Sequence, residues 1–355
     1  MSKSLIKKVL LLSSIFIILG FVTGKILDKN YLKNYNRNKI VGSDRYDSMV
    51  KINKERWNKS KDAVLINVYS TSDAISAAPF AYAKDIPMFF TESFELDENI
   101  KKEFKRLGVE KLYLIGGKNS ISKKLEKSIN KMGIDTERIF GKNSYETSLA
   151  LANKLSEVVD INQLAVVSLN EGKADGVAMA SPASKNNIPI ITMNKSGRSK
   201  LMEFIKDNNI EKVYFIGNED RFSQKFLDKI ENSIRINGEN RYDTNIKIIK
   251  EFYNLDDIDK VYMTKGGKER NIDFINTLCL STVAGKQDIP ILFNTQSLGK
   301  EQKTFLKEIN VNNITEVGFE LIRPKFINPT TKKIGISLLI VGLWIVSIRR
   351  INYSS

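Results

Sequence analysis

Histidine is absent from this sequence of 355 residues. Its absence excludes Ser-His-Asp and Cys-His catalysis, the common zinc sites and acid–base work by an imidazole. Cys279 is the only cysteine, so the chain can form neither an internal disulfide nor a thiolate metal cluster. Its setting, T-L-C-L-S, predicts a buried packing position rather than a reactive thiol. We expect no metal and no cofactor.

Acidic residues are missing from both ends of the chain: none precedes Lys25 and none follows Thr331. Seven basic residues lie in these ends and flank the two most apolar runs, at 9–22 and 334–348. Subtracting them from the 56 basic residues leaves 49 against 41 acidic ones, so nearly half of the net charge of +15 flanks apolar segments. The remaining excess suits a polyanion near a wall or membrane, or a solvated basic surface, and we expect no nucleic-acid partner.

The two apolar runs predict membrane segments. Within residues 1–28, a basic start followed by an apolar core is typical of an export signal. The exit, F-V-T-G-K, lacks a small-x-small cleavage site, so we predict an uncleaved signal anchor, with cleavage as the alternative. A transmembrane helix is predicted over 332–350, where an uncharged run lies between basic pairs. From the basic clusters at both ends, we predict that both termini lie in the cytoplasm and the rest of the chain outside.

A threefold repeat follows a polar linker at 29–39. The stretch 109–122, V-E-K-L-Y-L-I-G-G-K-N-S-I-S, predicts a buried strand, a tight glycine turn and a helix capped by Ser122. It returns at 210–223 and, more weakly, at 311–320, with closing glycines 101 positions apart. The other landmarks that keep their order are Tyr46, Tyr145 and Tyr242; Asp73, Asp175 and Asp273; and Pro87, Pro189 and Pro290. We therefore predict repeats at 40–138, 139–235 and 236–325.

Each repeat alternates helices with strands, and the strands contain continuous apolar stretches rather than alternating polar and apolar residues, as within 61–68 and 188–192. Such strands are buried on both faces, as in an open parallel sheet covered by helices. Residues 70–83, rich in small side chains, predict a helix that packs closely on a sheet. The predicted fold class is α/β, with three tandem modules of mostly parallel open sheets plus N- and C-terminal membrane helices.

Four motifs recur together: I-V-G-S-D-R-Y-D-S at 40–48, D-A-I-S-A-A-P-F-A at 73–81, D-I-P-M-F-F at 85–90 and the stretch that ends at Ser122. In this combination, from residue 40 to about 323, the chain resembles the type 2 cell-wall-binding repeat of clostridial and related Gram-positive surface and surface-layer-associated proteins. The resemblance implies three α/β modules in a pseudo-threefold arrangement, which together bind an anionic wall polysaccharide non-covalently. The repeats fill the chain, so we expect no accompanying enzyme domain.

Arg45 and Arg241 carry planar, always-charged groups that suit phosphate or carboxylate on a polymer. The predicted ligand-binding residues are Asp44, Arg45, Tyr46, Asp73, Arg241 and Tyr242. The alternative for the arginines is an internal clamp to Asp73 or Asp273, and helix N-capping is the alternative for Asp73. The middle repeat has Ser144 in place of an arginine, so a site that needs Asp-Arg in every repeat is not available.

Aromatic side chains offer a second kind of contact with a sugar polymer. The residues considered for stacking on sugar rings, with core packing as the alternative, are Trp57, Tyr69, Phe80 and Tyr82.

The sequence thus predicts a non-enzymatic, membrane-tethered protein whose repeats face the cell wall and bind an anionic wall polymer. A wall hydrolase, or a modifier of one, is the first alternative; it needs two carboxylates that converge in a cleft. An intracellular nucleotide-binding α/β protein is the second, but the turn at Gly116 lacks a phosphate-loop order of residues.

Overall fold

The computed structural model describes residues 35–169, 171–193, 197–267, 274–294 and 298–319. Both predicted membrane segments, 1–28 and 332–350, lie outside these ranges. Within them, no helix combines the length and the apolar character needed to cross a bilayer.

The described strands form three parallel sheets of four strands each, with the same order in each sheet. The first sheet is β3 (Met88–Thr91), β2 (Asp62–Asn67), β4 (Lys111–Ile115) and β5 (Asp135–Ile139). The second is β7 (Ile190–Met193), β6 (Gln163–Ser168), β8 (Lys212–Ile216) and β9 (Ser233–Ile236). The third is β11 (Ile291–Asn294), β10 (Lys260–Lys265), β12 (Asn313–Phe319) and β1 (Asn36–Gly42). The predicted class of three α/β modules with parallel sheets is confirmed.

Helices occupy equivalent places in the three modules. Those that open the repeats are α2 (Arg45–Lys54), α6 (Ser144–Ser156) and α10 (Arg241–Phe252). The small-residue helices are α3 (Thr71–Ala83), α7 (Lys173–Lys185) and α11 (Ile275–Lys286). The remaining helices are α4 (Glu98–Leu107), α8 (Arg198–Asp207) and α12 (Lys300–Glu308), then α5 (Lys123–Lys131), the short α9 (Gln224–Leu227) and the 3-10 turn η3 (Leu255–Asp257).

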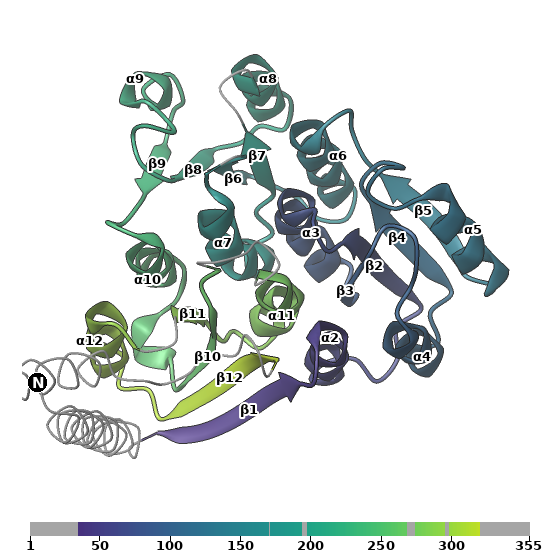
Figure 1. Cartoon of the computed structure of the whole chain (residues 1–355). Coiled ribbons are helices and arrows are strands. Elements are labelled where there is room, and N and C mark those ends of the chain that lie inside the picture. The colour runs from purple at the N-terminus through teal and green to yellow at the C-terminus, as the bar shows by residue number, and fades with distance from the viewer. Residues whose placement is uncertain (1–34, 170, 194–196, 268–273, 295–297, 320–355) are drawn as a thin grey trace, which may run out of the picture.

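The strand that opens each repeat completes the sheet of the module before it. β5 leads into the second repeat but pairs with β4, and β9 leads into the third repeat but pairs with β8. In the third sheet the same place is taken by β1, which pairs with β12 from Asn36 beside Asn313 to Gly42 beside Phe319. Figure 1 shows these two strands, purple and yellow-green, side by side. The beginning and the end of the described chain therefore close one ring of modules.

The centre of this ring is made of α3, α7 and α11, each of which packs against the other two. Alanine, serine and glycine allow the close approach: a Cβ added to Gly176 would lie 2.8 Å from Cδ1 of Ile75. The prediction that the helix at 70–83 packs on a sheet was incomplete, because α3 packs largely on α7 and α11. Their mutual packing supports the pseudo-threefold arrangement that the resemblance implies.

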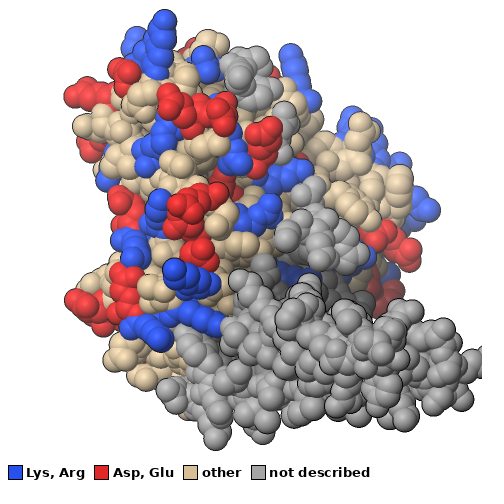
Figure 2. Space-filling model, turned by 60° about the vertical axis from the view of Figure 1, so that its left-hand side comes forward, with Lys and Arg blue, Asp and Glu red and all other residues tan. Residues whose placement is uncertain are grey.

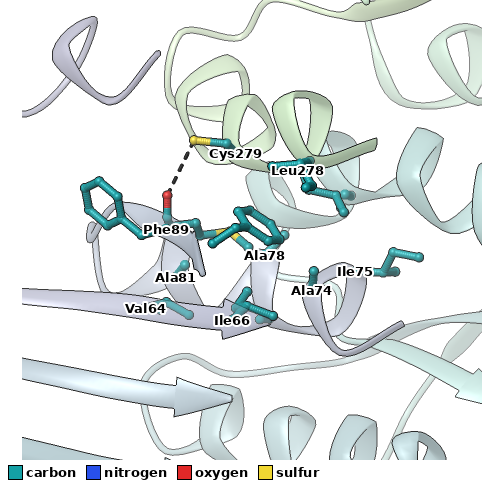
Figure 3. Packing of buried hydrophobic residues seen from close by; sticks show 14 of the residues in the cluster. Val64, Ile66, Ala74, Ile75, Ala78, Ala81, Phe89, Leu278 and Cys279 are labelled. Carbon is teal, nitrogen blue, oxygen red and sulfur yellow. Dashed lines mark hydrogen bonds between the residues drawn. The ribbon is translucent and has the colours of Figure 1, made fainter. Parts of the chain in front are cut away.

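Cys279 lies at this centre, where α11 meets the first module. Its side chain is fully buried, and Sγ donates to the carbonyl oxygen of Met88 at 3.4 Å (Figure 3). Burial raises the pKa of the thiol. The predicted packing role of this cysteine is therefore confirmed.

The turn after β4 is also confirmed as predicted. Gly116 has φ of 106°, a left-handed conformation that favours glycine. Ser122 then caps α5 by accepting a hydrogen bond from the backbone N–H of Leu125 at 3.2 Å. Arg138 of β5 holds the turn from the side, because it donates to the carbonyl oxygens of Gly116 and Gly117 at 2.8 and 3.1 Å.

Candidate functional site

The motif that opens each repeat forms the N-terminal cap of a helix. In the first repeat, the Asp44 carboxylate accepts hydrogen bonds from the backbone N–H groups of Tyr46 and Asp47 at 2.8 and 2.9 Å. Asp47 in turn accepts from the N–H of Ser43, the residue before the N-cap, at 2.8 Å. Asn143 and Asn240 cap α6 and α10 in the same way. One Asp44 oxygen is thus committed to the helix end.

Arg45, at the first position of α2, faces the carboxyl edge of the first sheet. Its guanidinium group lies 3.9 Å from Glu92, which follows β3, and 5.4 Å from the ring centroid of Tyr46. The buried Nη1 atom has no hydrogen-bond partner among the described residues. Burial raises the pKa of the half-buried Tyr46 hydroxyl. Arg45 therefore keeps donor capacity at a charged, partly open position.

Arg241, the counterpart in the third repeat, is used differently. Its Nη1 atom donates to the carbonyl oxygens of Gly266 and Gly267 at 2.9 and 2.8 Å, just after β10. The neighbouring Tyr242 ring packs over Gly266, where an added Cβ would lie 2.7 Å from the ring. Burial raises the pKa of Tyr242. These contacts are those of an internal clamp, made to backbone carbonyls.

Asp73 lies in the first turn of α3, and 5% of the residue is exposed. Its expected N-capping role is wrong, because Ser70 occupies the N-cap position and makes no side-chain cap. The Oδ1 atom of Asp73 is buried without a hydrogen-bond partner in the described chain. Burial raises the pKa of Asp73 to about 6, and a hydrogen bond from Ser144 of the next repeat opposes this only in part.

Asp175 is the equivalent carboxylate of the second module, with a different set of neighbours. It forms an ion pair with Arg221, and the positive charge of Arg241 acts on it as well. Burial raises the pKa of Asp175, and both arginines oppose that rise. The sequence reasoning missed Arg221, which stands four residues after Gly217 where the first repeat has Ser120.

The two described junctions between modules follow one rule. The aspartate in the first turn of a central helix faces the residue at the Arg45 position of the next repeat: Asp73 faces Ser144, and Asp175 faces Arg241. Asp273 lies outside the described residues. The buried carboxylate of the first junction therefore lacks the two arginines that surround its counterpart.

A hydrolytic carboxylate pair or a metal site would need acidic side chains in one cluster. Asp73 and Asp175 lie beside the glycine turns of two different sheets, near Gly116 and Gly217 respectively. In the described ranges, no group of three or more aspartate, glutamate, histidine or cysteine residues is placed to hold a metal ion.

Of the aromatic residues considered for stacking, Trp57 and Phe80 are buried in the core and Tyr82 is half-buried. Tyr69 differs, because it follows β2 and is 68% exposed. Charged residues are interspersed in sign over the face shown in Figure 2, without one continuous basic area.

The profile of the Cell wall binding domain 2 (CWB2) family matches residues 39–126, 138–227 and 235–335. The N-acetylmuramoyl-L-alanine amidase LytC of Bacillus subtilis (strain 168) is 29% identical over 282 residues, 79% of this chain and 55% of that protein. The amidase enhancer of the same strain is 27% identical over 266 residues, 73% of this chain and 34% of that protein. The chain thus spans about half the length of the first relative and a third of the second.

Two solved structures from Clostridium difficile share the fold. Cwp8 has a TM-score of 0.72 at 24% identity, covering 85% of this chain and 51% of that one. Cwp6 has a TM-score of 0.72 at 23% identity, covering 86% of this chain and 48% of that one. With three profile matches on three parallel-sheet modules, the chain belongs to the Cell wall binding domain 2 family.

Proposed function

We propose that this protein is a non-enzymatic, membrane-tethered wall-binding protein whose three modules hold an anionic wall polysaccharide non-covalently. The observation that supports it best is the presence of the family's domain three times in one closed ring. The apolar runs at 9–22 and 334–348 support the membrane attachment, with the modules on the outer side of the membrane.

The proposed polymer contacts remain Asp44, Arg45, Tyr46, Asp73, Arg241 and Tyr242. Arg45 is the strongest of them, because its side chain is 27% exposed at the surface and its ion pair with Glu92 is long, at 3.9 Å. An anionic group on the polymer would complete its hydrogen bonds. Arg241 is the weaker candidate, since its Nη1 already binds two carbonyl oxygens.

A second candidate function is the modification of a wall hydrolase. It is favoured by the likeness to an amidase and to an amidase enhancer, although the chain spans only part of each. Zymography of the purified chain, alone and mixed with a wall amidase, separates this function from plain binding.

Wall binding is tested with the full-length chain in mild detergent and with wall isolated from the bacterium that makes the protein. We expect chemical removal of the anionic polymers to weaken retention by at least about tenfold, because charged contacts carry much of the affinity. Retention should also fall as salt rises. Equal retention on intact and stripped wall would contradict the proposed ligand.

The two arginines serve as matched arms of this experiment. Arg45→Ala should lower retention by about ten- to a hundredfold with little change in melting temperature, since a charge-assisted bond is worth about 1.5–3 kcal/mol. Arg241→Ala should instead lower the melting temperature, because two carbonyl oxygens lose their donor.

The proposed topology predicts the labelling of cysteines in intact cells. In a Cys279→Ser background, Asn119→Cys should react with a membrane-impermeant maleimide, because Asn119 is exposed in the turn after β4. Ser355→Cys should be protected until the cells are lysed, because the basic clusters predict a cytoplasmic C-terminus. Labelling of Ser355→Cys in intact cells would overturn this topology.

A further inference from the structure

Three aromatic side chains are exposed in the described chain, and all three lie at the carboxyl edge of the first sheet. Tyr69 follows β2 and is 68% exposed, Phe94 follows β3 and is 69% exposed, and Phe140 follows β5 and is 50% exposed. The other aromatic side chains of the described residues are buried or half-buried. Such a concentration of exposed rings on one edge is not expected of a surface that meets only water.

The three rings surround the turn between β4 and α5. An added Cβ on Gly117 would lie 3.8 Å from Cδ2 of Phe140. Ser70, next to Tyr69, makes a hydrogen bond with Ser120 at 3.4 Å, and Ser93, next to Phe94, donates to the carbonyl oxygen of Asn119 at 3.3 Å. Since the sheet order is β3-β2-β4-β5, the segments that carry the rings follow strands that form a row about 14 Å wide, three strand spacings.

The backbone under this row is held in place by many hydrogen bonds. Asn67 donates to the carbonyl oxygen of Ser120 at 2.6 Å, and Arg138 donates to that of Ile121 at 3.0 Å. Thr91 donates to the carbonyl oxygen of Glu95 at 2.7 Å, which fixes the loop that carries Phe94. A surface that is already ordered loses little conformational entropy when a ligand binds.

The equivalent edges of the other modules lack these rings. The backbone N–H groups of Val68 and Gly266 each donate a hydrogen bond to the neighbouring strand of their own sheet, so these two residues are equivalent. The residue that follows is Tyr69 in the first module and Gly267 in the third. In the repeat motif, the place of Phe140 is taken by Val41 and Asn237. No aromatic residue occurs in the sequence at 193–199 or 294–299, the segments that correspond to the one with Phe94.

We propose that Tyr69, Phe94 and Phe140, called here the aromatic edge, stack on sugar rings of the wall polysaccharide and make the first module the main glycan contact. This inference rests on the proposed function. The faces of aromatic rings carry negative potential and attract the C–H groups on the apolar face of a sugar. The neighbouring serine and asparagine side chains offer partners for the sugar hydroxyls. Ligands of open α/β sheets also bind at the carboxyl ends of the strands.

The aromatic edge lies beside Arg45, the proposed contact with an anionic group, and adds contacts of a different kind, with uncharged sugar rings. The exposed Glu92 and Glu95 flank Phe94, whereas the exposed Lys118 and Lys142 follow β4 and β5. Because stacking on uncharged sugar rings is not an interaction between charges, the aromatic edge contributes a part of the affinity that salt does not screen.

The test measures retention of the full-length chain, in mild detergent, on isolated wall from low salt to 1 M NaCl. The wild type should keep a salt-resistant fraction, and the triple variant Tyr69→Ala/Phe94→Ala/Phe140→Ala should bind at high salt about tenfold more weakly. Phe94→Tyr should retain full binding and Phe94→Leu should not, because the latter keeps apolar area without a ring. The matched control is Met132→Ala/Met202→Ala, which removes exposed apolar side chains elsewhere and should change nothing.

Each other outcome is decisive. Unchanged high-salt retention of a folded triple variant would overturn the aromatic edge, and so would a wild type without a salt-resistant fraction. A loss of self-association in sedimentation, with wall retention intact, would show that a second copy covers the edge and would overturn it too. Failure of the wild type to bind wall at any salt concentration would instead overturn the proposed function.

Discussion

Gly141→Ala should destabilise the chain by about 3 kcal/mol or more and lower its melting temperature by roughly 5 °C. A Cβ at this position would lie 2.5 Å from the carbonyl carbon of Glu146 and 2.7 Å from the backbone nitrogen of Thr147. Backbone atoms in the first turn of a helix cannot move aside cheaply. The clash would also disturb the hydrogen bond from the Gly141 N–H to Oγ1 of Thr147, at 3.0 Å.

Gly117→Ala is the matched control, measured by thermal and urea unfolding under the same conditions. Its nearest neighbour would be Cδ2 of Phe140 at 3.8 Å, and its φ is not in the left-handed region, so alanine fits. We expect a change within about 0.5 kcal/mol. If the two variants were equally stable, the close approach at Gly141 would not be the reason for its place in the motif.

The same close approach explains why the opening motif could be found in the sequence. Gly42 and Gly238 meet the backbone of their own helices as Gly141 does, with an added Cβ 2.3 and 2.4 Å from the nearest nitrogen. Each motif solves one local problem, a chain that turns sharply into a capped helix. A structure that depends only on neighbouring residues leaves a recognisable pattern in the sequence. The strand, turn and cap around Gly116 were predicted for this reason.

Features that depend on distant contacts were not predictable in this way. The pairing of β1 with β12 joins residues 277 positions apart, from Asn36 to Asn313. The prediction of a polar linker at 29–39 was wrong for residues 36–39, which belong to β1, because their strand partner lies at the other end of the described chain. The packing of α3 on α7 and α11 was missed because small residues suit a sheet and a helix equally. Alignment of the repeats shows that Arg221 replaces Ser120, so this arginine could have been singled out from the sequence. Its ion pair with Asp175 could not, because only the fold brings the two residues together.

The role of Asp73 was missed for a related reason. An aspartate between a loop and a helix is typical of an N-cap, and a sequence does not show that Ser70 holds that position. Nor does it show that the next repeat brings Ser144 rather than arginine to this carboxylate. Comparing the three repeats shows arginine at this position in two of them and serine in one. What this difference does to a buried carboxylate follows only from the structure of the junction between modules.

Asp73→Asn should stabilise the chain at pH 8 by up to about 3 kcal/mol. The folded state raises the pKa of this carboxyl from 3.8 to about 6, because the residue is only 5% exposed. The folded chain therefore holds the proton between pH 4 and 6 while the unfolded chain releases it. This group makes stability fall as pH rises through that window, and asparagine, which cannot ionise, removes the loss.

Ser144→Arg should give a similar gain at pH 8 by a different route. It would place a cation beside Asp73, as Arg241 lies near Asp175, and would lower the pKa of the carboxyl. Neither variant should gain stability at pH 4, where Asp73 is protonated. In the double variant, arginine would face an amide and its contribution should vanish, so the two effects should not add.

Thermal unfolding at pH 4, 6 and 8 of the wild type, both single variants and the double variant checks these expectations. Asp207→Asn, at an exposed position on α8, is the control and should follow the wild type at every pH. Gains of the same size at pH 4 and pH 8 would show that ionisation of Asp73 is not their cause. A loss of stability in Asp73→Asn at pH 8 would mean that the carboxylate has a partner worth more than its burial costs. The buried, unbalanced charge assigned to the first junction would then be wrong.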